Sequence, residues 1–298
     1  MAVDCKEEKC QHYWHRIFGH RNINDVRKMQ NACTVGDFNI KDCGVTKTCE
    51  ICIKSKMTKT PFPSSGSMTN NVMDLVHSDV CGPMPTPTVS GFRYFLTFID
   101  DYSRYTVVYL LRFKSEVFEQ TKLYLEMVRN KFGRYPKIIR SDNGGEYVNS
   151  QMKVHLEKLG ILRQFTVPYN PQQNGVAERK NRCLVEMVRC LLNDSGLPDY
   201  LWGEALMTAN YLQNRLVSSS ISSTPYELWE QKKPNIEHLK IFGSKAYSLT
   251  PKEKLRKLDN RSKEYVFVGY DYQSKGYRLL DMATNRTVIS RDVKFIGN

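Results

Sequence analysis

The chain has 298 residues, of which 41% are hydrophobic, so it can form packed domains and its composition argues against general disorder. Lys and Arg number 44 against 31 Asp and Glu, and the net charge of +13 favours a polyanionic partner such as nucleic acid. The first residues lack a hydrophobic signal region and no apolar run approaches a membrane span of roughly 20 residues, so we expect neither secretion nor a membrane partner.

The N-terminal segment is rich in cysteine and histidine. Six of the nine cysteines lie within the first 52 residues, which indicates a metal-bound module rather than a disulfide framework. Four residues separate His15 from His20, and 28 separate His20 from the CxxC pair Cys49 and Cys52. Two imidazoles and two thiolates suit one structural Zn²⁺ in a closed tetrahedral site. The rival ligands, which leave a swapped pair possible, are Cys5, Cys10, His12, Cys33 and Cys43.

Strand and helix patterns then alternate, after a Pro- and Ser-rich linker at residues 60–67. The apolar patterns predict strands at residues 73–80, 93–99, 106–111, 137–140 and 162–167. Helical spacing predicts helices at residues 115–132, 147–159, 176–192 and 199–216. A small all-β module is indicated by short strands at residues 246–249, 265–270, 277–281 and 288–289.

Three carboxylates stand at the ends of these elements. Asp79 ends the first apolar run, Asp142 follows the strand at 137–140, and Glu178 lies in the first turn of the long helix. If they converge at one sheet edge, their oxygens suit two Mg²⁺ or Mn²⁺ ions. Taken singly, each is as well explained by a turn or a helix cap. Asp100 and Asp101 are explained by a hairpin turn and are set aside.

Basic and amide side chains near these carboxylates are candidate DNA contacts. On the long helix, Arg182 and Arg189 share the face of Glu178, and Arg179 lies beside it, which suits a phosphodiester substrate. An ordinary solvated face with ion pairs four residues apart is the alternative. Asn174, in the loop before the helix, can offer an amide to DNA or serve only as the helix entry. A basic run precedes the last strands and comprises Lys252, Lys254, Arg256 and Lys257. These side chains either contact a DNA backbone or are ordinary solvated charges.

Short motifs in a fixed order carry a resemblance to a known family. They lie at residues 14–20, 49–52, 77–83, 98–104, 141–147 and 171–179, with further matches at 268–270, 275–277 and 290–293. Through their order and spacing, the chain resembles copia-type LTR-retrotransposon integrases, of the retroviral integrase superfamily, along nearly its whole length.

The resemblance implies an α/β fold in three parts. These are an HHCC zinc-binding helical domain at residues 1–62, an RNase H-like catalytic core with a helical extension at 68–235, and a basic β-rich module at 236–298. The core is expected to contain a mixed five-stranded sheet with helices. By position the resemblance assigns the catalytic triad to Asp79, Asp142 and Glu178. It assigns zinc to His15, His20, Cys49 and Cys52.

The same resemblance implies a two-metal polynucleotidyl transferase with endonuclease-type chemistry, which joins donor DNA 3′ ends to target DNA. It also implies a homo-multimer that acts in the nucleus after a stage in a cytoplasmic particle, encoded in an intact element with reverse transcriptase and protease. Two alternatives stay open: a domesticated or catalytically unused DNA-binding protein, and a simple RNase H-type nuclease.

Overall fold

The computed structural model describes residues 10–32, 40, 41, 43, 49–56, 69–165, 174–218, 220–250, 253, 256–272 and 274–296. The chain divides into two units. The core unit comprises Thr58–Val185 and Asn214–Pro234, and the flanking unit comprises Met1–Met57, Glu186–Gln213 and Asn235–Asn298. This grouping differs from the three predicted domains, because Glu186–Gln213 groups with both ends of the chain. The predicted boundaries themselves stay predictions.

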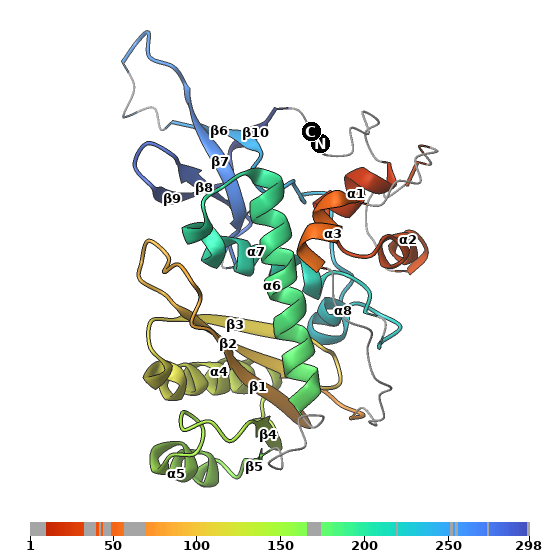
Figure 1. Cartoon of the computed structure of the whole chain (residues 1–298), viewed down its shortest axis with the longest axis vertical. Coiled ribbons are helices and arrows are strands. Elements are labelled where there is room, and N and C mark those ends of the chain that lie inside the picture. Colours follow the sequence, from red (N-terminus) through yellow and green to blue (C-terminus); the bar gives the residue numbers. More distant parts are fainter. Residues whose placement is uncertain are drawn as a thin grey trace. The chain divides into compact units, whose positions relative to one another are not determined.

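A mixed five-stranded sheet forms the centre of the core unit, in the order β3–β2–β1–β4–β5 (Figure 1). Its strands are β1 (Leu75–Cys81), β2 (Tyr94–Asp100), β3 (Thr106–Leu111), β4 (Ile138–Ser141) and β5 (Leu162–Phe165). β1, β2 and β3 pair antiparallel, whereas β1, β4 and β5 pair parallel. The expected mixed sheet is therefore confirmed, and its parallel pairs require the helical crossovers that follow.

Two helices supply these crossovers: α4 (Val117–Phe132) and α5 (Ser150–Lys158). A 3₁₀ turn, Lys114–Glu116, precedes α4 and accounts for the earlier start predicted for this helix. The buried α4 residues recur at helical spacing, and Tyr124 stacks on Phe98 of β2 at 4.1 Å between ring centroids. α4 thus covers the sheet with one apolar face, and these residues belong to a single buried cluster.

A short helix, α8 (Pro225–Glu230), also joins this core and was absent from the predicted elements. Its Trp229 stacks on Tyr105 at 4.5 Å and meets Phe132 edge-on at 4.8 Å. The sequence did contain a helix-start signal, because the side chain of Thr224 accepts a hydrogen bond from the backbone of Glu227 and Pro225 occupies the first helical position.

The flanking unit contains several helices and a second sheet. Its helical segments are α1 (Gln11–Ile17), α2 (Ile23–Ala32), α3 (Glu50–Lys56), the second part of α6 (Gly175–Ser195), the 3₁₀ turn η3 (Asp199–Leu201) and α7 (Trp202–Asn214). Its antiparallel sheet has the order β10–β6–β7–β8–β9. The strands are β6 (Lys245–Leu249), β7 (Ser262–Tyr270), β8 (Tyr277–Asp281), β9 (Arg286–Ser290) and β10 (Val293–Phe295). The predicted β-rich module is confirmed, with β10 as an additional edge strand.

Two polar contacts hold this second sheet to α7. Arg278 makes a bidentate ion pair with Glu204, at 2.6 and 2.8 Å. Thr208 donates its hydroxyl to the backbone of Val268 at 3.0 Å. Gly269 permits this approach: its φ is 150°, and a Cβ there would lie 2.7 Å from the Thr208 oxygen. No described helix has the length and apolar character needed to span a membrane.

Two leucines of α4 test the packing of the core unit. Leu125 of α4 is fully buried, whereas Leu123 on the same helix is 58% exposed. We expect Leu125→Ala to lower the free energy of unfolding by about 2–5 kcal/mol, because it leaves a cavity. Leu123→Ala, the matched control, should change it by less than about 0.5 kcal/mol. Urea unfolding followed by circular dichroism measures both, and equal effects would contradict the packing described.

Candidate active site and metal centre

Two of the three predicted catalytic carboxylates lie at one edge of the core sheet. Asp79 belongs to the last part of β1, and Asp142 directly follows β4. β1 and β4 are parallel neighbours, with His77 opposite Arg140, so continuing this register by two residues sets Asp79 opposite Asp142. The predicted convergence of these two strand ends therefore follows from the pairing of the strands.

The electrostatics of Asp79 include the third carboxylate. Burial raises the pKa of Asp79 to about 7, and the negative charges of Asp142 and then Glu178 contribute to this rise. Glu178 lies in the first turn of α6. The described Cys, His, Asp and Glu residues form two groups whose ligand atoms all lie within 4.8 Å of one another, and neither group includes this triad. The ligand atoms of the three carboxylates are therefore not all within 4.8 Å of one another in this structure.

Asn181 holds Asp79 in place and was missed by the sequence analysis. Its side-chain amide donates to the Asp79 carboxylate at 2.8 Å, and its carbonyl oxygen accepts from the Thr97 hydroxyl at 3.0 Å. Thr97 is the β2 residue opposite Asp79. The available signal was spacing, since Asn181 follows Glu178 by three residues and so shares its side of the helix.

The loop after Asp142 uses Gly144 for a close approach. The backbone N–H of Gly144 donates to the Asp142 carboxylate at 3.0 Å. A Cβ at Gly144 would lie 2.8 Å from the carboxyl group of Glu146 and 3.0 Å from that of Asp142. Glu146 is paired with Lys114 at 3.0 Å. A glycine at this position therefore leaves the space that the two carboxylates occupy, which a side chain would take away.

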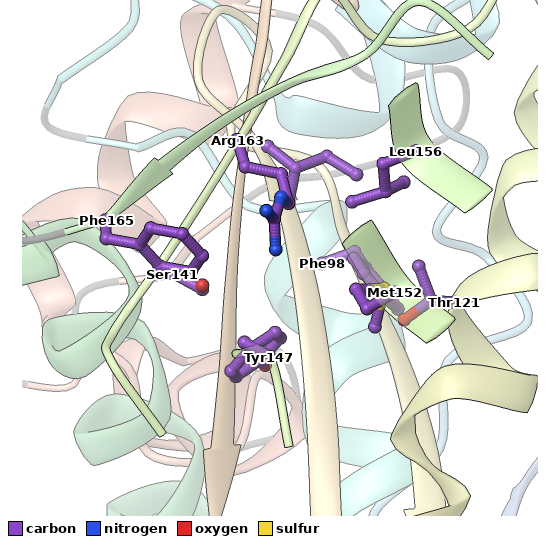
Figure 2. A pocket seen from close by; sticks show the side chains of 9 residues that line it. Phe98, Thr121, Ser141, Tyr147, Met152, Leu156, Arg163 and Phe165 are labelled. Atoms are coloured by element: carbon purple, nitrogen blue, oxygen red, sulfur yellow. The ribbon is translucent and has the colours of Figure 1, made fainter. Parts of the chain in front are cut away.

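A small pocket lies beside these strand ends in the core unit (Figure 2). Its lining includes Ser141, Tyr147 and Arg163, and it has room for about one water molecule. The Tyr147 hydroxyl hydrogen-bonds to Ser78, the neighbour of Asp79, at 2.8 Å. Burial raises the pKa of Tyr147 well above its ordinary value, so this phenol stays protonated and serves to brace β1.

Asp100 and Asp101, which the sequence analysis set aside, have structural partners. The Asp100 carboxylate accepts from the backbone of Met73 and from the backbone and hydroxyl of Ser103. The Asp101 carboxylate accepts from His77 at 2.9 Å and lies 3.1 Å from Arg104. These contacts join the hairpin turn to β1 and the segment before it, which supports its interpretation as a structural feature.

The four predicted zinc ligands come together in the flanking unit, and their ligand atoms all lie within 4.8 Å of one another. The Nε2 atom of His15 faces the thiol of Cys52 at 3.2 Å, while its Nδ1 donates to the backbone carbonyl of Arg21 at 2.6 Å. The Nδ1 atom of His20 faces the thiol of Cys49 at 3.4 Å. Each imidazole thus turns one nitrogen toward the thiols, as zinc-binding histidines do.

Arg189 and Asp194, near the end of α6, contact this cluster and its helix α3, and the sequence did not predict these contacts. The Asp194 carboxylate lies 3.7 Å from Nε2 of His20 and pairs with Arg16 at 3.1 Å. The Arg189 guanidinium donates to the backbone carbonyl of Ser55 in α3 at 2.9 Å. Asp194 thus lies near the outer nitrogen of His20, where carboxylates orient zinc-binding histidines, but beyond hydrogen-bond distance. The donor set and its surroundings therefore fit a tetrahedral zinc ion.

The predicted DNA contacts differ in their surroundings. Arg179 and Arg182 are exposed on α6. Arg189 is also exposed, but it bonds Ser55 as described above. Asn174 is 2% exposed, so its side chain offers little surface to a ligand. In the basic run, Arg256 and Lys257 are exposed, and Lys252 and Lys254 lie outside the described residues.

Comparisons with known proteins agree on one family. Residues 70–171 match the family model "Integrase core domain", and residues 244–298 match "Retroviral polymerase SH3-like domain". The chain is 40% identical over 284 residues to the Retrovirus-related Pol polyprotein from transposon TNT 1-94 of Nicotiana tabacum, covering 95% of the chain and 21% of that protein. It is 32% identical over 286 residues to the Retrovirus-related Pol polyprotein from transposon RE1 of Arabidopsis thaliana, covering 96% of this chain and 19% of that protein.

The chain thus spans about a fifth of the length of these curated relatives. Among solved structures, one similar chain comes from the cryoEM structure of the simian T-cell lymphotropic virus intasome in complex with PP2A regulatory subunit B56 gamma. The two are 16% identical with a TM-score of 0.47, over 83% of this chain and 87% of that one.

The raised pKa of Asp79 predicts how stability depends on pH in metal-free protein. The pKa is about 7 in the folded state against an ordinary 3.8, so the folded state binds the proton more tightly. Stability should therefore fall as pH rises through this window, with the full penalty above about pH 7. Asp79→Asn should flatten this fall and stabilise the chain at about pH 8 by on the order of 1–2 kcal/mol. Urea unfolding of wild type and Asp79→Asn across this pH range, without divalent ions, measures the fall and its loss in the variant.

Asp74→Asn is the control with the opposite sign. The ion pair with Lys137 holds the pKa of Asp74 below its ordinary value, so its charged form stabilises the fold. Removing that charge should therefore lower stability at the same high pH. A loss of stability in Asp79→Asn comparable to that of the control would contradict the crowding of charges at Asp79.

Proposed function

We propose that this chain, which belongs to the copia-type retrotransposon integrases, joins donor DNA 3′ ends to target DNA by metal-dependent polynucleotidyl transfer. The observation that carries the proposal is the pairing of β1 and β4, whose register sets Asp79 opposite Asp142. Burial raises the pKa of Asp79, and the negative charges of Asp142 and Glu178 add to that rise. Perturbed acids gathered in this way are typical of sites that bind cations or transfer protons. The integrase core domain supports transfer chemistry for the class.

The donor set suits hard cations, because it consists of carboxylate oxygens alone. Asp79, Asp142 and Glu178 would together hold two Mg²⁺ or Mn²⁺ ions. When bound, such ions activate the attacking 3′-hydroxyl and stabilise the leaving oxygen. Asn181 keeps the Asp79 carboxylate oriented through its 2.8 Å hydrogen bond. Because the DNA hydroxyl is the nucleophile, the chemistry requires no serine or cysteine nucleophile.

The proposed DNA surface begins next to this site. Arg179 and Arg182 are exposed within one turn of Glu178, where their charges can meet the phosphates that flank the reacting bond. The exposed Arg256 and Lys257 and the net charge of +13 support a wider contact with DNA. We further propose that the chain acts as a homo-multimer, because integrases act on two donor ends at once. We also propose that it works in the nucleus after a stage in a cytoplasmic particle.

The His15, His20, Cys49 and Cys52 cluster is proposed to bind a structural zinc ion. Four protein ligands fill a tetrahedral site and leave no position for a substrate. Its short helices have few buried residues of their own, so zinc binding would supply part of the folding energy of this segment.

Asp79→Asn tests the transfer proposal directly. We expect strand transfer of a linear donor in Mg²⁺ or Mn²⁺ to fall by at least about 100-fold, because one of the three proposed metal ligands is lost. DNA affinity should change by less than about twofold, since phosphate contacts dominate it. Glu119→Gln is the matched control, because it removes one carboxylate whose side chain is 63% exposed on α4. It should leave strand transfer unchanged.

The same assay separates the rival functions. Normal strand transfer by Asp79→Asn would contradict the assignment of the triad. DNA binding by the wild-type chain without any transfer would favour a catalytically unused, domesticated protein. Cleavage of an RNA–DNA hybrid without joining would favour a simple nuclease.

Removing one zinc ligand tests the structural site. Cys49→Ser should lower the zinc content by one equivalent per chain, because a thiolate is a stronger zinc ligand than a hydroxyl. Cys183→Ser is the matched control, since Cys183 belongs to neither described cluster of metal-binding side chains. Elemental analysis of the purified full chain measures the content. Unchanged zinc in Cys49→Ser would contradict the assignment.

A further inference from the structure

A second group of metal-binding side chains lies in the flanking unit, apart from the four proposed zinc ligands. The ligand atoms of Cys10, His12 and Cys43 all lie within 4.8 Å of one another. The sequence alone offered these residues only as rivals for a single zinc site. The structure instead separates them from that site, because neither group contains a residue of the other.

Local backbone structure brings these three residues together. Cys10 is the N-cap of α1, where its sulfur accepts a hydrogen bond from the backbone of Tyr13 at 3.4 Å. A parallel bridge pairs Cys10 with Lys41, which brings Cys43 to the start of the helix. There, Nδ1 of His12 lies 3.2 Å from the sulfur of Cys43. Two chain segments about 30 residues apart in sequence therefore meet through ligand atoms.

The chemistry of this group is that of a zinc site. Two thiols and an imidazole are soft or borderline ligands, which favour Zn²⁺ over Mg²⁺ or Ca²⁺. Cys10 is fully buried and is not in a disulfide, so its sulfur is protected from solvent. We propose that Cys10, His12 and Cys43 bind a second zinc ion, with water in the fourth position of the tetrahedron.

This second ion would stabilise the helix that carries ligands of both sites. His12 and His15 are three residues apart on α1 and so lie on the same side of it. α1 has only 7 residues, too few for a helix to be stable without tertiary support. A metal at its first turn would fix the start of the helix and thereby the position of His15. Loss of the second ion should therefore weaken zinc binding at the first site.

The zinc content of the full chain tests this proposal, and the test does not depend on strand-transfer activity. Elemental analysis of wild-type protein purified from zinc-containing medium should give two zinc ions per chain. Cys43→Ser and Cys49→Ser should each lose one, and Cys183→Ser should keep both. Titration with a chelator should release the ion of the three-ligand site first, because fewer protein ligands hold it.

Other results would overturn the second site. A content of one zinc ion per wild-type chain would overturn it. This result needs no variant, so it does not depend on whether a variant folds. Two zinc ions retained in Cys43→Ser would also contradict it, provided that circular dichroism shows the variant to be folded. A disulfide between Cys10 and Cys43 in freshly purified wild-type protein, detected by mass spectrometry, would replace the proposed metal with a covalent bond.

Discussion

Burial of the Asp79 carboxylate, with the negative charges of Asp142 and Glu178 acting on it, is the constraint on which the proposed active site depends. The parallel pairing of β1 and β4 sets the two aspartates at one edge, and the first turn of α6 adds the glutamate. Burial and these like charges raise the pKa of Asp79 to about 7. The hydrogen bond from Asn181 offsets part of this cost, since a bond to a charged group contributes about 1.5–3 kcal/mol. Bound cations would offset the rest of the free-energy cost of ionising Asp79, because they neutralise the carboxylates.

α6 contributes residues to both functional clusters. Its first turns carry Glu178 and Asn181 of the carboxylate site, and its last turns carry Arg189 and Asp194, which contact α3 and His20. One continuous 21-residue helix therefore carries residues of both clusters, at its two ends. Arg189 shows that an exposed charged residue on this helix can also serve the fold, because its guanidinium donates to the backbone carbonyl of Ser55.

The sequence predicted the features that depend on local periodicity and failed where contacts join distant segments. The core strands and α4 were located from apolar spacing, and the carboxylates from their places at element ends. Asn181 and Asp194 were missed, because their roles depend on partners 102 and 178 residues away. Helical spacing predicted a DNA-facing position for Arg189. It could not predict the hydrogen bond from Arg189 to the carbonyl of Ser55, which lies 134 residues earlier. β10 was missed because three residues are too few for a strand pattern.

Ligand chemistry keeps the two kinds of proposed metal apart within one chain. The active site offers carboxylate oxygens, which suit Mg²⁺ or Mn²⁺ and leave positions for water and substrate. Both flanking clusters offer thiols and imidazoles, which favour zinc. Zinc could in principle also occupy the carboxylates, since most ligands bind it more tightly than Mn²⁺. Thiolate sites fill at much lower free zinc than a carboxylate site does, so when free zinc is scarce the oxygen site binds the more abundant hard cations.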